Sequence, residues 1–213
     1  LDELAKEVKS AGGEIKTVVA NMSIEADIDN LINTAVSTYG TLDILVNNAG
    51  IMDHFQPVGE VENSMLEKVM KINFEGPFKA MRSAVKIFLE KGKGNIINVC
   101  SIGGLKGGAA GAVYTSSKHA LVGLTKSTGY LYSKSGIRCN GIAPGAVNTS
   151  ISETIDMTKI TPLVNDRIMT GLALNPRAGE ASEIAQAALF LASDDSSFVN
   201  AEILTVDGGW SAY

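Results

Sequence analysis

NIINVC (residues 95–100), SIGGLKGGAAG (residues 101–111) and AVYTSSK (residues 112–118) follow one another without interruption in the middle of the chain. The first segment is an apolar run, which is typical of a strand buried on both faces. The second is rich in glycine, which is typical of a loop. The third begins a stretch with helical periodicity that continues to about residue 134. This region therefore predicts a strand, a loop and a helix in succession, as in the βα units around a parallel sheet.

The same alternation of helices and strands extends to both ends of the chain. With 213 residues, of which 45% are hydrophobic, the chain can bury one substantial α/β core. We expect a single domain over residues 1–213, with a Rossmann-like, doubly wound parallel sheet and helices on both faces. Residues 148–178 are expected to be a partly helical substrate loop. The expected helices are residues 1–11, 24–38, 61–89, 112–134 and 180–192, and the expected strands are residues 14–20, 42–46, 95–100, 137–143 and 203–206.

The composition argues against several classes of function. The formal charge is −5, and no dense stripe of Lys and Arg is present, so a nucleic acid is not an expected partner. No apolar stretch approaches the roughly 20 residues that a membrane-spanning helix needs, and no secretion signal is recognisable. Cys100 and Cys139 lie in apolar runs, where buried free thiols are expected rather than a disulfide. We therefore expect a cytoplasmic protein without a membrane partner.

Tyr114 and Lys118 are the sharpest local feature. Their spacing of four near the start of a helix places both side chains on one face. A phenol has an ordinary pKa of about 10, and a neighbouring ammonium favours the phenolate, which predicts a general acid or base usable near neutral pH. Most such pairs taken alone are ordinary surface neighbours. Ser101 follows a strand, where open α/β sheets bind ligands, although a turn-forming role fits this serine equally well.

Four motifs together resemble one enzyme family. Asn47-Asn48-Ala49-Gly50, Ser101, Tyr114-x-x-x-Lys118 and Pro144-Gly145 resemble, in order and spacing, the short-chain dehydrogenase/reductase family in its single-domain form. The resemblance covers the whole chain, to Val206-Asp207-Gly208-Gly209 near its end. It implies a nicotinamide cofactor, NAD or NADP, that carries the hydride while the protein supplies general acid/base chemistry.

The resemblance also implies a role for each catalytic residue. Tyr114 would exchange a proton with the substrate oxygen, and Lys118 would lower the pKa of Tyr114 and hold the nicotinamide ribose. Ser101 would hydrogen-bond the reacting carbonyl. Asn73 matches the family asparagine that holds a water in the proton relay. A buried asparagine within a helix needs hydrogen-bond partners, so a structural role in a helix bend is compatible with the catalytic one.

Cofactor contacts follow from the same resemblance. Residues expected near the adenine ribose are Asn47, Ala49 and Gly50, and those expected at the nicotinamide end are Pro144, Gly145, Val147 and Thr149. For Asn47 and Asn48, a turn that ties neighbouring strands together is an alternative. After strand 14–20 the family commonly has an aspartate that contacts the adenine amine, whereas this sequence has Asn21 followed by Met22. The amide oxygen of Asn21 can still accept from that amine.

Neither of the two histidines is expected to bind a metal. His119 adjoins Lys118 but lies about 100° round the helix. His54 stands alone in the loop after Gly50 and is kept as a possible substrate-rim residue. Because a metal site needs several ligands together, we expect none.

The front of the family's cofactor-binding half is not recognisable in the chain. The glycine-rich turn that binds pyrophosphate is expected before Leu1, together with the residue that distinguishes NAD from NADP. We expect roughly 40 preceding residues, about one βαβ unit. The strands of that first unit would lie between strand 14–20 and strand 42–46 in the sheet.

Three functions remain open. The leading prediction is an NAD(P)-dependent oxidoreductase that interconverts a secondary alcohol and a ketone or aldehyde. A 3-oxoacyl-carrier-protein reductase shares all these motifs, and a non-catalytic truncated homologue could act as a binding or assembly subunit. Substrate choice is expected to depend on residues 51–57, 102–112 and 148–175. A partly apolar pocket for a small-molecule substrate is suggested by Met52, Phe55, Leu105 and Ile151. The family usually forms homotetramers through its long helices.

Overall fold

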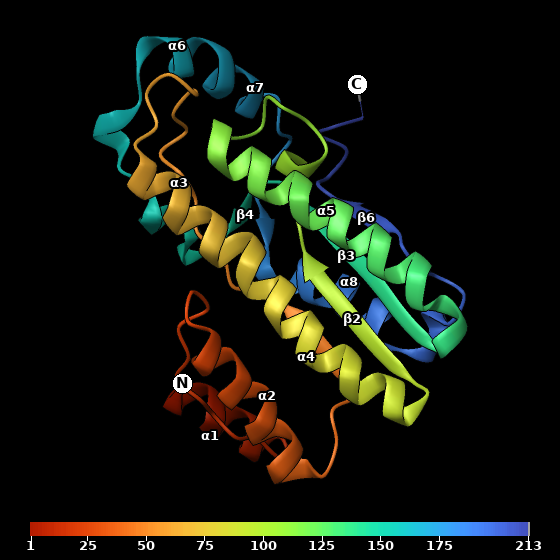
Figure 1. Ribbon diagram of the computed structural model, residues 1–213. Coiled ribbons are helices and arrows are strands. Elements are labelled where there is room, and N and C mark those ends of the chain that lie inside the picture. The colour runs from red at the N-terminus through yellow and green to blue at the C-terminus, as the bar shows by residue number, and fades with distance from the viewer. Residues whose placement is uncertain (213) are drawn as a thin grey trace.

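The computed structural model describes residues 1–212 and contains a parallel sheet at its centre (Figure 1). Four strands pair in the order β1-β2-β3-β6. All three pairings are parallel. The strands are β1 (Ile44–Asn47), β2 (Gly94–Val99), β3 (Ile137–Pro144) and β6 (Ile203–Val206). The two central strands, β2 and β3, are almost entirely buried, as expected for strands covered on both faces. The predicted parallel α/β fold is therefore confirmed.

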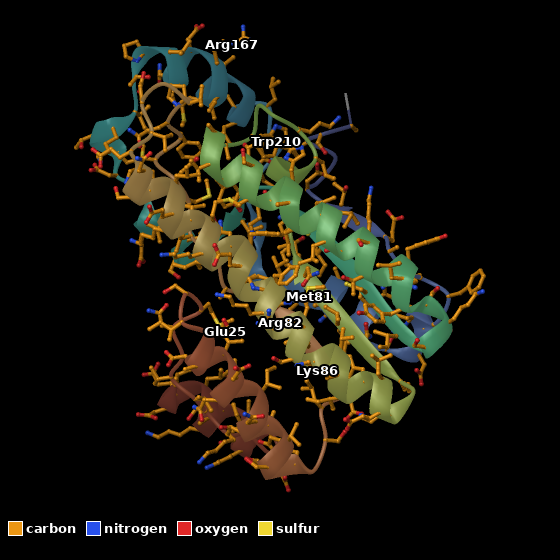
Figure 2. All side chains as sticks on the ribbon, viewed as in Figure 1. Glu25, Met81, Arg82, Lys86, Arg167 and Trp210 are labelled. Carbon is orange, nitrogen blue, oxygen red and sulfur yellow. The ribbon has the colours of Figure 1, made fainter. Side chains whose placement is uncertain are left out.

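Helices cover both faces of this sheet. One face packs against α4 (Gly76–Lys91) and α5 (Ala112–Tyr132), and the other packs against α8 (Ala181–Ala192). The N-terminal helices are α1 (Asp2–Ser10) and α2 (Glu25–Tyr39), and α2 packs against α4. Figure 2 shows Glu25 and Arg82 side by side between these two helices, where their side chains form an ion pair. Each helix lies within about two residues of its predicted range.

The predicted strand at residues 14–20 is wrong. The segment is not a strand, because no other segment within residues 1–212 forms a hydrogen-bonded ladder with it. Extended backbone becomes a sheet strand only with such a partner. The side chain of Val19 is 88% exposed, and Ile44 and Val46 on β1 are also exposed. The strand-like sequence of residues 14–20 is therefore not accompanied by strand pairing within residues 1–212.

The predicted long helix at residues 61–89 contains an irregularity. It consists of α3 (Asn63–Met70), a π-helical turn at Lys71–Glu75 and α4. Asn73 lies inside the π-helical turn and is fully buried. Single π-helical turns within α-helices occur frequently at functional sites, because they displace side chains from the regular helical positions. The expected structural role of Asn73 in a helix bend is thus compatible with the structure.

Residues 148–178 form a partly helical excursion, as predicted. They contain two 3-10 turns followed by two short helices, α6 (Pro162–Val164) and α7 (Thr170–Leu172), with a π-helical turn between the helices. A two-stranded parallel sheet of β4 (Val147–Asn148) and β5 (Gly179–Glu180) closes the base of the excursion. Trp210 attaches α7 to the C-terminal segment, because its Nε1 donates to the carbonyl oxygen of Gly171 at 3.0 Å. Figure 2 shows Trp210 beside α7.

Candidate active site

Three chemically active side chains meet at the carboxyl edge of the sheet. Ser101 immediately follows β2, and Tyr114 and Lys118 lie in the first two turns of α5. The loop between β2 and α5 lies against the Tyr114 ring, since a Cβ added to Gly103 would be 3.4 Å from both Cε1 of Tyr114 and Oγ of Ser101. The Ser101 hydroxyl lies near enough to the Tyr114 hydroxyl to lower the pKa of Tyr114. The structure therefore brings together the pair that the sequence placed thirteen residues apart.

The protonation state of Tyr114 differs from the sequence prediction. The side chain is only 6% exposed, and burial raises its pKa to about 12. The Ser101 hydroxyl acts in the opposite direction, and the nearby charge of Asp53 adds to the rise. The expected lowering by Lys118 is not found, because desolvation of the phenolate outweighs the local attractions. Tyr114 is consequently a neutral phenol at pH 7, with a proton available for donation.

Lys118 is buried beside Tyr114 but does not bond its hydroxyl. Its Nζ donates to the carbonyl oxygen of Val99 at 2.8 Å and lies 5.6 Å from the centre of the Tyr114 ring. The residue is 3% exposed, and burial lowers its pKa to about 8. An ammonium has three N–H donors, and only one is used by Val99. Lys118 can therefore hold a proton at neutral pH and still offer two donors.

Asn73 is tied to the loop that follows β1. Its Oδ1 accepts from the amide of Ile51 at 2.9 Å, and its Nδ2 donates to the carbonyl oxygen of Ile51 at 2.9 Å. The same Nδ2 lies 3.2 Å from Oγ of Ser117 in α5. This arrangement links the π-helical turn, the loop after β1 and the helix that carries Tyr114. All the polar groups of the buried amide thus have partners, which accounts for its burial.

The chain's residues fit the ribose and nicotinamide end of a dinucleotide. A Cβ added to Gly50 would lie 3.4 Å from Oδ1 of Asn73 and 3.5 Å from Nζ of Lys118. The absence of a side chain at Gly50 thus leaves space beside the free donors of a buried ammonium. Such donors suit the hydroxyl groups of a ribose. This space and these donors are compatible with the cofactor role expected for Gly50 and Lys118.

Most of the residues expected at the nicotinamide end lie at the same edge of the sheet. Pro144 ends β3, and the amide of Gly145 donates to the carbonyl oxygen of Val206 at 3.0 Å. Val147 begins β4, and Thr149 caps the 3-10 turn that follows. The carboxyl ends of parallel strands share one edge, so this segment and Ser101 face a common region.

The residues expected near the adenine ribose have structural partners. Nδ2 of Asn47 donates to Oδ1 of Asn98 at 2.8 Å, which ties β1 to β2 as the alternative interpretation proposed. Oδ1 of Asn21 accepts from both the amide and the hydroxyl of Ser23. Both lone pairs of that oxygen are thereby used, so the predicted bond from the adenine amine has no free acceptor at Asn21. The carbonyl oxygen of Met22 packs closely against α4.

An apolar cluster surrounds Tyr114 and includes part of the predicted pocket. Met52 and Phe55 belong to this cluster, whereas Leu105 packs in another, and Ile151 is in neither. His54, the expected rim residue, accepts from the amide of Asp156 through Nδ1 at 2.9 Å. The cluster joins the loop after β1 to the excursion at residues 148–178; its members are Met52, Phe55, Ala110, Tyr114, Ile155, Ile160, Val164, Ile168, Met169 and Leu172.

Sequence reasoning missed Asp53. Its carboxylate is fully buried and accepts hydrogen bonds from the amides of Val113 and Tyr114. Tyr114 lies 61 residues further along the chain. Burial raises the pKa of Asp53, and the amide hydrogen bonds oppose this rise. One sequence signal could have indicated it: α5 begins after Gly111, which has no side chain to cap the helix.

Residues 1–212 contain neither a metal-binding cluster nor a membrane-spanning helix. No three His, Cys, Asp or Glu side chains lie close enough together there to hold a metal ion. No helix in this part of the chain has both the length and the apolarity to cross a membrane. Cys100 and Cys139 are free and buried, and burial raises the pKa of both thiols.

Comparison with known proteins identifies the family. The family model described as "Enoyl-(Acyl carrier protein) reductase" matches residues 1–211. The 3beta-hydroxysteroid dehydrogenase 2 of Eggerthella lenta is 42% identical over 214 residues, which cover 100% of this chain and 82% of that protein. The chain belongs to the short-chain dehydrogenase/reductase family. This member of the family is therefore an enzyme, an oxidoreductase that uses a nicotinamide cofactor and interconverts an alcohol and a carbonyl compound.

Other relatives agree with this assignment of the short-chain dehydrogenase/reductase. The levodione reductase of Leifsonia aquatica is 38% identical over 93% of this chain and 75% of that protein. A crystal structure of levodione reductase superposes with a TM-score of 0.87 at 34% identity, covering 99% of this chain and 84% of that one. A crystal structure of a gluconate 5-dehydrogenase from Burkholderia cenocepacia, in complex with NADP and tartrate, superposes with a TM-score of 0.85 at 30% identity. The match covers 99% of this chain and 81% of that one.

Proposed function

We propose that Tyr114 is the proton donor of a reaction that interconverts an apolar secondary alcohol and its ketone, with Ser101, Lys118 and Asn73 as its partners. The observation that carries this proposal is the Tyr114 phenol itself. It is buried, near Ser101 and neutral at pH 7, and it lies beside Lys118, which borders the space at Gly50. A protonated group beside the substrate oxygen is what carbonyl reduction requires.

Each residue has one task in the reduction. A nicotinamide cofactor, when bound, would supply the hydride for the reduction. The hydroxyl of Tyr114 gives its proton to the carbonyl oxygen, and Ser101 donates a hydrogen bond to the same oxygen as negative charge develops there. Lys118, with a pKa of about 8, returns a proton toward the phenolate. Alcohol oxidation uses the same groups in reverse, with Tyr114 accepting the proton.

Asn73 is proposed to support the proton route through the loop after β1. Its amide holds both polar groups of the Ile51 peptide and also bonds Ser117 in α5. The loop that carries Gly50 is thereby fixed against the helix that carries Lys118. The family role of a water-holding asparagine is proposed for this residue on the same basis.

The apolar cluster supports an apolar substrate. Phe55, Val164 and the Tyr114 ring are buried in it, and the excursion supplies further aliphatic side chains. One relative is named for a 3beta-hydroxysteroid and another for levodione. We therefore propose a steroid or another apolar ring compound, with NAD or NADP as the cofactor.

A second candidate, a carrier-protein reductase, is favoured by one observation. The matching family model is described by its action on an acyl carrier protein. A carrier protein that is acidic would prefer a basic docking surface, whereas this chain has a net charge of −5. This candidate is thus secondary. The interpretation as a non-catalytic subunit is set aside, because relatives that share 38–42% identity are oxidoreductases.

Assembly and location are part of the proposal. Large exposed apolar side chains on α4, α5 and α8 support a homotetramer formed through helices; they include Leu89, Tyr130, Leu131, Leu189 and Phe190. A cytoplasmic location is proposed because the two cysteines are free. Sedimentation of the purified protein gives the number of subunits, and a monomer at all concentrations would contradict the tetramer.

A substrate panel tests the proposed function. The purified protein is mixed with NADH or NADPH and with a 3-ketosteroid, levodione or an acetoacetyl-carrier protein, and cofactor oxidation is followed by absorbance. We expect turnover of the apolar ring ketones. Turnover of the carrier-protein thioester alone would favour the second candidate. If none of these carbonyl compounds is reduced with either cofactor, the proposed substrate class is wrong.

A further inference from the structure

The helix that carries Tyr114 begins without a cap of its own. Its N-cap residue is Gly111, and no side chain of the first turn accepts from the free amides there. An α-helix normally satisfies the second and third of these amides with an oxygen from the N-cap side chain. In α5 these two amides belong to Val113 and Tyr114. The amide of the proposed proton donor therefore needs an acceptor from elsewhere in the chain.

Asp53 supplies that acceptor from the loop after β1. Its Oδ2 accepts from the amide of Val113 at 3.1 Å and from the amide of Tyr114 at 2.9 Å. Its Oδ1 accepts from the amide of Phe55 at 3.0 Å, which fixes the carboxylate within its own loop. A Cβ added to Gly111 would lie 2.5 Å from both carboxylate oxygens, so only glycine leaves room for Asp53 at this position.

Backbone amides stabilise the charged form of the Asp53 carboxyl group and oppose the rise in its pKa that burial causes. Both oxygens act as acceptors from backbone amides, and none of its hydrogen bonds within residues 1–212 has the carboxyl group as donor. A fully buried negative charge therefore lies at the start of the helix, where the helix dipole also favours it.

Several groups act on the Tyr114 hydroxyl from the surrounding elements. Ser101, at the end of β2, lowers the pKa of Tyr114, and Lys118 lies over the Tyr114 ring from α5. The charge of Asp53, and that of the Cys100 thiol when ionised, raise the pKa of Tyr114. Of the two groups that raise it, Cys100 has its own pKa raised to about 11 and is neutral at pH 7. Asp53 is accordingly the charged neighbour that opposes ionisation of the phenol.

We propose that Asp53 is a positioning residue for Tyr114, because its carboxylate anchors the Tyr114 amide across 61 residues and its charge favours the neutral phenol. The inference rests on the proton-donor role proposed above for Tyr114. Asp53 touches the backbone of Tyr114 rather than the substrate. The negative charge of Asp53 raises the pKa of Tyr114. In alcohol oxidation, where the phenolate is the reactive form, Tyr114 therefore stays protonated up to a higher pH.

The variant Asp53→Asn removes the charge while retaining one acceptor oxygen. We expect the pH profile of kcat/KM for alcohol oxidation to shift to lower pH, because the phenolate forms more readily without the negative neighbour. We also expect kcat to fall by about tenfold, because the Tyr114 amide is held less firmly. The control is Asp29→Asn, which removes one charge from the exposed face of α2 and should leave the profile unchanged.

Asp53→Ala provides the second measurement, since it removes both the charge and the cap. It should shift the profile in the same direction as Asp53→Asn and lower the melting temperature further. Lower stability with an unmoved pH profile in both variants would overturn the inference and leave Asp53 as a structural cap. Tyr114→Phe distinguishes the two proposals: if that variant keeps full turnover, the role of Tyr114 fails, whatever Asp53 does.

Discussion

Lys118→Met tests whether the ammonium is as buried as the structure shows. Burial lowers the pKa of Lys118 from 10.5 to about 8, which corresponds to about 3 kcal/mol of unfavourable free energy for the charged form in the folded state. Met has a similar length and no charge, so it removes this cost. It also leaves the Val99 carbonyl oxygen without its partner, at a cost of about 1–3 kcal/mol that does not depend on pH. The absolute difference in stability is therefore less informative than its change with pH.

The sign follows from proton binding. Between about pH 8 and pH 10.5 the unfolded chain keeps the Lys118 proton while the folded protein has lost it, so the stability of the parent protein rises with pH. Relative to that of Lys118→Met, the free energy of unfolding of the parent protein should rise by about 3 kcal/mol across this interval and should stay constant below it. Urea unfolding of both proteins, from about pH 7 to about pH 10.5, measures this difference. A difference that stays constant with pH would refute the burial of the ammonium.

Two further substitutions test the supports of the site. Asn98→Leu leaves Nδ2 of Asn47 without an acceptor in the core, so we expect urea unfolding to show a loss of about 2–3 kcal/mol; a change below about 0.5 kcal/mol would mean that the Asn47 amide finds another partner. Trp210→Phe removes the Nε1 donor to Gly171 while keeping an aromatic ring. Steady-state kinetics should then show a several-fold rise in KM with a smaller change in kcat, and an unchanged KM would indicate that this bond does not hold the substrate excursion.

The sheet could be predicted where its strands are covered on both faces. The segment Ile203–Val206 was predicted to the residue, and residues 137–143 differ from β3 by one, because continuous apolar runs mark buried parallel strands. Residues 14–20 also have a strand-like sequence but form no strand. A strand forms only when it pairs with a segment distant in sequence, and the local sequence pattern does not show whether such a segment is present. The π-helical turn around Asn73 is equally invisible in the sequence, since the residues on either side keep helical periodicity.

The site could be predicted as a set of residues but not in its electrostatics. Ser101 and Tyr114 meet because a strand end and a helix start share one edge of the sheet. The pKa of Tyr114 was predicted in the wrong direction, because desolvation is set by side chains from the whole fold. Asp53 was missed for a related reason: its contact with Tyr114 bridges 61 residues, and no short motif contains both.

The measurement that tests the central claim most directly is the turnover of Tyr114→Phe. The substitution removes only the hydroxyl, so the apolar packing of the ring is retained. We predict that kcat falls by roughly a factor of 10²–10⁴, the usual contribution of a general acid, while the melting temperature and the dissociation constant of the nicotinamide cofactor stay close to those of the parent protein. Undiminished turnover in this variant would show that the proton comes from another group and would contradict the account.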